Sequence, residues 1–444
     1  MPRNSALLLA ALIAAPAWPE PLSADPGVKP GALDPHRPLA QELVASARTS
    51  VTLVGTLGAQ GDLSRLDPAV AAWLSSDGAN VTIGTLDAPA FDLGAIKAYP
   101  YPWGAAPVRR ATPAAVTALR QAGFAGLLLA TDHALDWGIE GMRATADQLD
   151  AAGIAHAGTG DNAARARAAA YVDERHGGGR IGIVSAATSF RPTSEALDQQ
   201  GAAPGRPGVS AVALAPVRLV SAPELATLGR VACRFQHPGD ERACATPTPA
   251  DTVAALGSSF ALAAAGAEGT TRFEANALQT AGLLHAIREG KESGDLLVAG
   301  LHAAQTEDER VPDPPVPGFL KALAHQALDA GADLVVVTGG PALGPVETDR
   351  QPGGTRQLVF YGLGQFLGQG DGAVVRTDIG RGGTAVTIHP IEHDAAGMPH
   401  PAARAKAAAM LERLKARSES YGSVIAIVPD GAGLAGRIVA AEGK

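Results

Sequence analysis

Short apolar runs alternate with helical patterns along most of the chain, and this alternation constrains the fold more than any other feature. Most of the runs are continuously apolar, whereas a strand with one face in water alternates apolar and polar residues, so we expect strands covered on both faces. The predicted strands are 51–54, 81–83, 126–129, 181–184, 296–298, 334–337, 358–361 and 385–388. Strands that alternate with helices are typical of layered α/β proteins.

The helical patterns carry their own start and stop signals. Thr112 is suited to cap a helix over 113–121, because Pro113 fits the first helical position and Gly123 follows shortly after the end. Asp136 is the predicted N-cap of a helix that begins near 139. Further helices are predicted over 139–152, 319–330 and 403–416, and a last strand over 424–428.

The composition indicates a folded protein and argues against nucleic acid as a partner. Of the 444 residues, 46% are hydrophobic and 18% are charged, as in globular chains. The formal net charge is −8 and no run is rich in Lys and Arg, whereas binding to nucleic acid needs a basic surface.

The N-terminus has the pattern of a secretory signal peptide over residues 1–17. Arg3 is followed by an apolar stretch over 6–15, and Ala15-Pro16-Ala17 fits the small-x-small cleavage rule. A helix needs about 20 apolar residues to span a bilayer, and this stretch is shorter. We therefore expect a periplasmic or secreted protein, with membrane association only if this segment is retained as an anchor.

The only two cysteines of the chain, Cys233 and Cys244, flank a polar segment that contains Pro238-Gly239 and is predicted to be a loop. A disulfide that closes this loop is the favoured interpretation, and it would stabilise the fold by roughly 3 kcal/mol at most. Two buried thiols are the simpler alternative. A metal site with His237 lacks an obvious fourth ligand.

These features divide the chain into four parts. The signal peptide (1–17) is followed by a linker rich in proline and polar residues (18–48) and by one large domain (49–395). Within that domain, residues 186–275 break the alternation and are predicted to form an irregular excursion around Cys233 and Cys244. Residues 396–444 are predicted to add a C-terminal helix and strand.

Acidic residues and histidines follow the ends of several predicted strands. Asp132 and His133 lie just after the strand over 126–129, Asp87 follows 81–83, and His302 follows 296–298. Because the carboxyl ends of parallel strands converge on one crevice, these residues are candidates for a common site.

The segment Ala130-Thr131-Asp132-His133-Ala134-Leu135-Asp136-Trp137-Gly138 resembles the Ala-Asn-Asn-His-x-Leu-Asp-x-Gly motif of the CapA family, the poly-γ-glutamate capsule-synthesis proteins. The resemblance covers about 50–390 in the order of the family, and the block Asp-Ala-Gly-Ala-Asp-Leu-Val is intact at 329–335. It implies an α/β fold of the calcineurin-like metallophosphoesterase type, a layered sandwich of mixed β-sheets flanked by helices.

The chain departs from the family where metal ligands are expected. The aspartate of the family's Gly-Asp motif is replaced by Thr56, and the two histidines of Gly-His-Pro-His are replaced by Gly339 and Pro341. A two-metal site needs several Asp, His and Asn ligands around ions about 4 Å apart. Asp132 replaces an asparagine of the family, which favours a cation but opposes a bound phosphate.

Four candidate residues remain. We expect Asp132 and His133 to act as the catalytic acid–base element, and Asp87 and His302 to hold one divalent ion (Mn, Fe or Zn). The same side chains could also form an acid–base pair with no metal. Simpler interpretations are a turn-opening role for Asp87 and buried, hydrogen-bonded histidines left over from an ancestral site.

The resemblance implies an exported CapA-like protein of capsule or poly-γ-glutamate biosynthesis, with an altered metal-dependent hydrolase centre and with anionic polymer or envelope components as partners. One alternative is a catalytically inactive relative that binds polymer as an envelope scaffold, and another is a hydrolase of an unrelated ester or amide. Arg191, Arg206 and Arg310 lie in predicted loops and could recognise a polyanion, although solvated surface arginines are the simpler interpretation.

Overall fold

The computed structural model describes residues 49–58, 63–75, 80–103, 107–173, 179–240, 244, 251–350, 356–380 and 383–439. All of them belong to one compact unit, Ala40–Lys444. The predicted signal peptide (1–17) and linker (18–48) lie outside the described residues.

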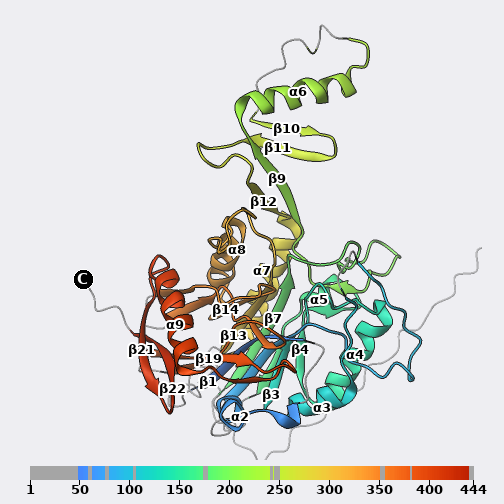
Figure 1. Cartoon of the computed structure of the whole chain (residues 1–444). Helices are drawn as coiled ribbons and strands as arrows, with labels where there is room; N and C mark the ends of the chain where they lie inside the picture. The colour runs from blue at the N-terminus through green and yellow to red at the C-terminus, as the bar shows by residue number, and fades with distance from the viewer. Residues whose placement is uncertain are drawn as a thin grey trace, which may run out of the picture. The chain divides into compact units, whose positions relative to one another are not determined.

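Two large mixed β-sheets form the centre of the fold (Figure 1). The first sheet has the order β21 (Val424–Asp430), β22 (Gly433–Val439), β19 (Gly383–His393), β18 (Gly372–Gly380), β1 (Thr49–Leu57), β2 (Asn80–Leu86), β3 (Phe124–Leu128) and β4 (Ala155–Ala157), with β17 (Gln365–Leu367) beside β1 and β20 (Pro399–Pro401) beside β19. The second has the order β15 (Val346–Arg350), β16 (Arg356–Phe360), β14 (Leu334–Thr338), β13 (Leu296–His302), β7 (Arg180–Ala187) and β6 (Ala170–Asp173). Each strand predicted from an apolar run is present in one of these two sheets.

The strands that bear on the site are parallel. β1 to β4 run in one direction, and β7, β13, β14 and β16 do the same in the second sheet. Parallel strands end at the same edge of a sheet, so the residues that follow β2, β3 and β13 are brought to neighbouring positions.

The two sheets pack face to face over a common apolar core. Leu53, Ile83, Leu128, Ile183 and Val298 are buried in this core. The sheets approach so closely that a Cβ atom on Gly300 of β13 would lie 2.4 Å from Cδ1 of Leu128. Burial on both faces explains why the strands are continuous apolar runs.

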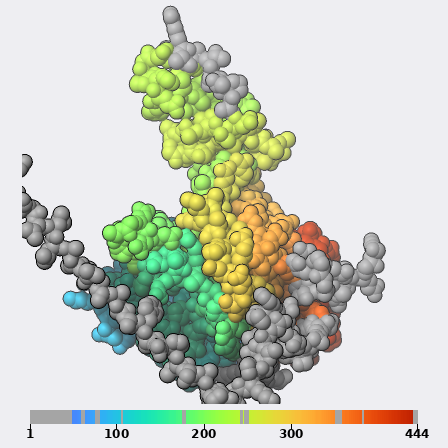
Figure 2. All heavy atoms as spheres, turned by 180° about the vertical axis from the view of Figure 1, so that it is seen from behind, coloured from blue at the N-terminus to red at the C-terminus, as the bar shows by residue number. Residues whose placement is uncertain are grey.

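Helices cover the outer faces of both sheets. α2 (Pro68–Ser75), α3 (Pro113–Gln121) and α4 (Gly138–Ala152) pack on the first sheet, and α7 (Ala277–Glu292) and α8 (Gly318–Asp329) pack side by side on the second (Figures 1 and 2). α9 (Arg404–Glu419) packs against β21 and β22. The hydroxyl of Thr112 accepts a hydrogen bond from the amide of Ala115, as expected of the predicted cap of α3. The predicted α/β fold class, a layered sandwich of mixed sheets flanked by helices, is confirmed.

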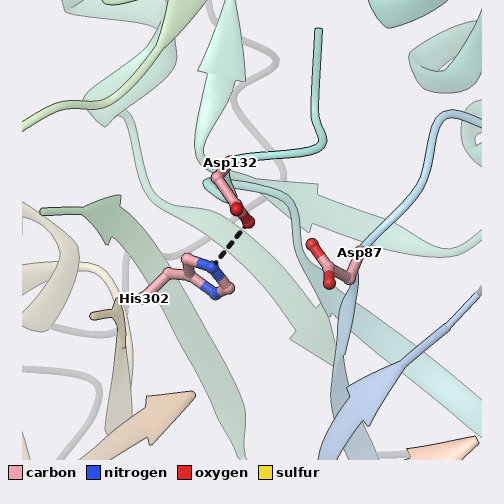
Figure 3. A group of neighbouring side chains, drawn as sticks. All are labelled: Asp87, Asp132 and His302. Atoms are coloured by element: carbon pink, nitrogen blue, oxygen red, sulfur yellow. Dashed lines mark hydrogen bonds and ion pairs between the residues drawn. The ribbon is translucent and has the colours of Figure 1, made fainter. Parts of the chain in front are cut away.

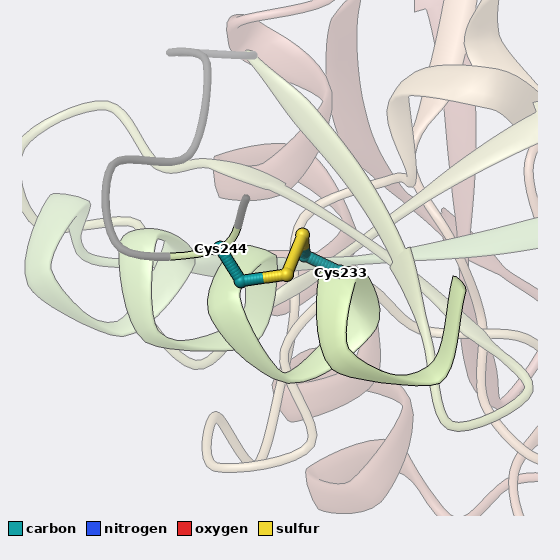
Figure 4. Close-up of a disulfide and its surroundings, with 2 residues drawn as sticks. All are labelled: Cys233 and Cys244. Carbon is teal, nitrogen blue, oxygen red and sulfur yellow. A yellow bond between two sulfur atoms is a disulfide. The ribbon is translucent and has the colours of Figure 1, made fainter. Parts of the chain in front are cut away.

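The segment 186–275 contains regular elements, in contrast to the irregular excursion expected from the sequence. β9 (Leu214–Val220), β10 (Thr252–Ala255), β11 (Ser258–Leu262) and β12 (Thr271–Ala275) form a four-stranded sheet, on which α6 (Ala222–Gln236) packs. The sequence does not predict these strands, because they are short and largely exposed and so form no continuous apolar runs. The predicted disulfide between Cys233, on α6, and Cys244 is present (Figure 4).

The C-terminal segment continues the first sheet. α9 and β21 correspond to the predicted helix and strand, and β22 adds a further strand that pairs with β19. Among the described residues, none of the helices is both long enough and apolar enough to cross a membrane.

Candidate metal centre

Asp87, Asp132 and His302 converge at the carboxyl ends of three strands (Figure 3). Asp87 directly follows β2, Asp132 lies in the turn after β3, and His302 is the last residue of β13. One ligand atom from each of the three residues lies within 4.8 Å of the other two. The two sheets therefore contribute jointly to one group of metal-ligating side chains, as predicted from their positions after strands.

His302 links the two sheets through its side chain. Its Nε2 lies 3.1 Å from Oδ1 of Asp132, and its Nδ1 lies 3.3 Å from the hydroxyl of Thr338 at the end of β14. Although burial by itself raises the pKa of Asp132, the hydrogen bond with His302 and the nearby charges of His302, His133 and Arg109 lower it to about 2. Asp132 is therefore a carboxylate over the physiological pH range, and its side chain is 29% exposed, which opens the group to solvent.

Asp87 is the more deeply buried carboxyl group. One oxygen, Oδ2, forms an ion pair with Arg109, whereas Oδ1 is buried and has no hydrogen-bond partner. Burial raises the pKa of Asp87, and the charges of His302 and Arg109 only partly offset this. The hydroxyl of Thr56, which replaces the expected aspartate after β1, is also buried without a partner. Buried oxygens without a donor are costly in an apolar interior, and a bound cation would satisfy Oδ1 of Asp87.

His133 is held by a second carboxylate rather than by Asp132. Its Nδ1 lies 2.8 Å from Oδ2 of Asp136, and because a carboxylate only accepts hydrogen bonds, Nδ1 carries the proton. Asp136 also forms an ion pair with Arg191, and both of these side chains are buried. The remaining ring nitrogen of His133, Nε2, lies 4.0 Å from Oδ2 of Asp132.

This geometry changes two expectations from the sequence and adds a contact to a third residue. Asp132, expected to act with His133, lies 4.0 Å from Nε2 of that residue and also hydrogen-bonds to His302. Asp136, expected to cap α4, is turned inward to His133 and Arg191, and Trp137 occupies the cap position without a side-chain cap. Arg191, interpreted as a solvated surface arginine, is buried because it neutralises Asp136.

Arg109, in the loop that precedes α3, forms hydrogen bonds with the segment that contains Asp136. The amide of Arg109 donates to Oδ2 of Asp136 at 2.5 Å, and its carbonyl accepts from Nε1 of Trp137 at 2.9 Å. Nε of Arg191 donates to the carbonyl of Asp132 at 3.0 Å. Arg109 was not identified from the sequence, because it follows a long loop and belongs to no motif. Asp136 lies in the quoted motif, but spacing alone did not separate a cap from a histidine partner.

The positions that lost metal ligands are occupied by tightly packed backbone. A Cβ atom on Gly55 would lie 2.0 Å from the carbonyl oxygen of Gly364, and the amide of Thr56 donates to that oxygen. Gly339 adopts a φ of 101° directly after β14, a conformation that favours glycine. Thr56 and Gly339 thus preserve the strand ends but supply no carboxylate or imidazole.

The donor set that remains fits a single divalent ion. Two carboxylates and one imidazole are ligands that Mn, Fe and Zn accept, and three protein ligands leave coordination positions open for water or substrate. Donation from Nδ1 of His302 to the hydroxyl of Thr338 would orient the ring with Nε2 toward the ion. Asp87, Asp132 and His302 could therefore hold a metal ion.

Comparison with known proteins gives the family. Residues 59–369, more than half of the chain, match the model of the family described as "Bacterial capsule synthesis protein PGA_cap". The chain belongs to this family. The CapA resemblance seen in the sequence is thereby confirmed.

Two proteins of Sinorhizobium fredii, "Uncharacterized protein y4sH" and "Uncharacterized protein y4uA", are each 32% identical to the chain over 294 residues, which is 65% of this chain. The chain spans 59% of the length of these two relatives. Among solved structures, the chain is similar to a novel phosphatase from Mycoplasma pneumoniae at 10% identity and a TM-score of 0.35, over 76% of this chain and 89% of that one. A likeness at this TM-score adds nothing to the fold described above.

Proposed function

We propose that the chain is an exported protein of capsule biosynthesis that acts as a hydrolase with a single divalent metal ion. The convergence of Asp87, Asp132 and His302 carries this proposal, because their ligand atoms lie within 4.8 Å of one another. Membership of the capsule-synthesis family supports the biological setting. Anionic polymer or envelope components are the proposed partners.

Asp87, Asp132 and His302 would hold the ion, which would be Mn, Fe or Zn. A bound ion of this kind lowers the pKa of a water ligand and polarises an ester or phosphoryl oxygen. The carboxylate of Asp132 opposes the approach of a strongly anionic group, and the guanidinium of Arg109 is already paired with Asp87. A substrate that is neutral or carries a single negative charge near the scissile bond therefore suits the site better than a phosphate monoester.

His133 is the proposed proton-transfer group. Asp136 fixes the proton on Nδ1 and leaves Nε2 facing Asp132, beside the proposed ligands. Nε2 would accept a proton from the attacking water or deliver one to the leaving group. Arg191 supports this role indirectly, because its ion pair with Asp136 holds that side chain beside His133.

Export is supported by the disulfide. Bonds such as that between Cys233 and Cys244 form and persist in oxidising compartments. The periplasm or the cell exterior is therefore the proposed location, in agreement with the signal-peptide pattern of the sequence.

A scaffold without catalytic activity is the second candidate, and one observation favours it. Arg109 forms an ion pair with Asp87, and His302 hydrogen-bonds to Asp132, so both carboxyl groups already have partners within the protein. Thr56, which stands where the family has a metal-binding aspartate, also favours the scaffold. In this alternative the protein binds polymer or an envelope partner and has no catalytic activity.

Elemental analysis of the protein, purified from the periplasm without chelator, distinguishes the two. The hydrolase proposal expects stoichiometric Mn, Fe or Zn that is lost in His302→Ala but retained in His133→Ala. His285→Ala is the matched control, because His285 is exposed on α7 and lies outside the group. If the unaltered protein carries no metal and takes up none on addition, the hydrolase proposal is wrong and the scaffold is the better account.

A further inference from the structure

Three large aromatic side chains are exposed in one short segment beside the candidate centre. Tyr99, Tyr101 and Trp103 lie in the sequence Tyr-Pro-Tyr-Pro-Trp and are 73%, 49% and 44% exposed. The whole chain has only five Tyr and four Trp, so a third of them lie within five residues. Exposed aromatic rings gathered in one place mark binding surfaces, because their apolar faces remain in contact with water until a ligand covers them.

The two prolines of this segment limit its conformational freedom. Pro100 and Pro102 fix their own φ angles, and a residue that precedes proline is biased toward extended backbone. The two prolines therefore stiffen the segment that carries the three rings, so little entropy is lost when a ligand binds.

The segment is fastened to the residues of the candidate centre. The amide of Tyr101 donates to the carbonyl of Asp136 at 2.7 Å, and the carbonyl of Tyr101 accepts from Arg191. Arg191 in turn donates to the carbonyl of Asp132. The aromatic segment is thus two hydrogen bonds away from a proposed metal ligand.

The charges around the segment argue against a polyanion as its ligand. The segment itself carries no charged side chain. Arg109 is paired with Asp87, and Arg110 donates to the carbonyl of Phe91 while it lies over the ring of that residue. Lys97 precedes the segment and is exposed, but one lysine is a weak site for a polymer with repeating carboxylates.

A chain of sugar rings matches these observations. A pyranose has an apolar face of C–H groups that stacks on an aromatic ring, and hydroxyl groups at its edge that remain in water or bond to polar groups. We propose that Tyr99, Tyr101 and Trp103 form a platform that binds a glycan chain and presents it to the Asp87–Asp132–His302 centre. This inference rests on the proposed hydrolase function and names a glycan, rather than a glutamate polymer, as the substrate class.

The test is calorimetric titration of the full chain with three neutral hexasaccharides (chitohexaose, cellohexaose and maltohexaose) and with a short poly-γ-glutamate. At least one hexasaccharide should bind, and Trp103→Ala should weaken its Kd by about tenfold, the size expected when one aromatic stacking contact is lost. Phe235→Ala is the matched control, because Phe235 is an exposed aromatic residue on α6, and this variant should bind like the unaltered protein.

The same titration is repeated with an Asp132→Asn/His302→Ala double variant, which removes metal ligands but leaves the aromatic segment unchanged. Retained glycan binding there, with metal lost, shows that the platform works independently of the centre. The inference is overturned if none of the three hexasaccharides binds, if Trp103→Ala has no effect, or if poly-γ-glutamate binds in their place. Each of these outcomes leaves the metal analysis, and with it the hydrolase proposal, to be judged separately.

Discussion

Two histidine–aspartate pairs in the first sheet and its loops have the same contact but different surroundings. Nδ1 of His133 lies 2.8 Å from Oδ2 of Asp136, and Nδ1 of His389 lies 2.8 Å from Oδ2 of Asp430. Asp136 is buried and forms an ion pair with Arg191, whereas Asp430 is 37% exposed at the end of β21.

The opposite side of each ring differs as well. Nε2 of His133 faces the carboxylate of Asp132, whereas the ring of His389 stacks on Trp73 of α2 with centroids 4.4 Å apart. One pair is therefore placed beside a group of metal-ligating side chains, and the other joins a helix to the sheet. The comparison teaches that a histidine–aspartate contact becomes a candidate for chemistry only where further charged groups converge on it.

The largest expected difference between the two pairs concerns activity. His133→Gln should lower hydrolysis of a chromogenic phosphodiester by about 10²–10⁴-fold, because a positioned acid–base group contributes that much. His389→Gln should leave the rate unchanged. The measurement is kcat for both variants with metal content determined in parallel. Equal rates for His133→Gln and the unaltered protein would remove His133 from the mechanism.

The burial of the first pair should also be visible in the free energy of unfolding. Arg191→Met leaves the carboxylate of Asp136 buried without a counter-charge, which costs about 3–5 kcal/mol of unfolding free energy. Arg206→Met is the control, because Arg206 pairs with Glu195 near the surface and such pairs contribute about 1 kcal/mol or less. Urea unfolding of both variants gives the comparison. A loss below about 1 kcal/mol in Arg191→Met would mean that Asp136 is not held as a buried carboxylate.

The fold followed from the sequence because its signals are local. Continuous apolar runs as short as 181–184 and 334–337 favour strands covered on both faces, and helix caps such as Thr112 depend on a few neighbouring residues. Asp87, Asp132 and His302 were predicted to lie in a common site because each comes within four residues of the end of a predicted strand, and the structure brings them together.

The partners within the centre could not be predicted in the same way. Which carboxylate pairs with which histidine depends on side-chain directions set by distant segments, as with Arg191, which reaches Asp136 from 55 positions further along the chain (191 − 136). Arg109 reaches Asp87 from a loop with no regular structure. A charged residue in a predicted loop is usually exposed, so the burial of Arg191 contradicted the general expectation.

A smaller effect is expected from the exposed partner of the second pair. Asp430→Asn keeps an acceptor for His389 but removes the charge, so it should lower the unfolding free energy by about 0.5–1.5 kcal/mol. Asp136→Asn should cost clearly more, because it leaves Arg191 as a buried cation without a counter-charge. Urea unfolding of the two variants side by side measures the difference. Equal losses would show that exposure does not distinguish the pairs.

The smallest effect is a pH dependence that belongs to the second pair. Burial lowers the pKa of His389, although its hydrogen bond to Asp430 partly offsets this. Below a pH of about 6.5 the unfolded chain binds a proton at this histidine before the folded chain does, so the unfolding free energy falls as the pH falls from 7 toward 5. His389→Gln should make this decline shallower, whereas replacement of the exposed His285 by Gln should leave it unchanged. The two slopes come from urea unfolding at each pH, and an unchanged slope in His389→Gln would mean that the stacked histidine titrates as it does in water.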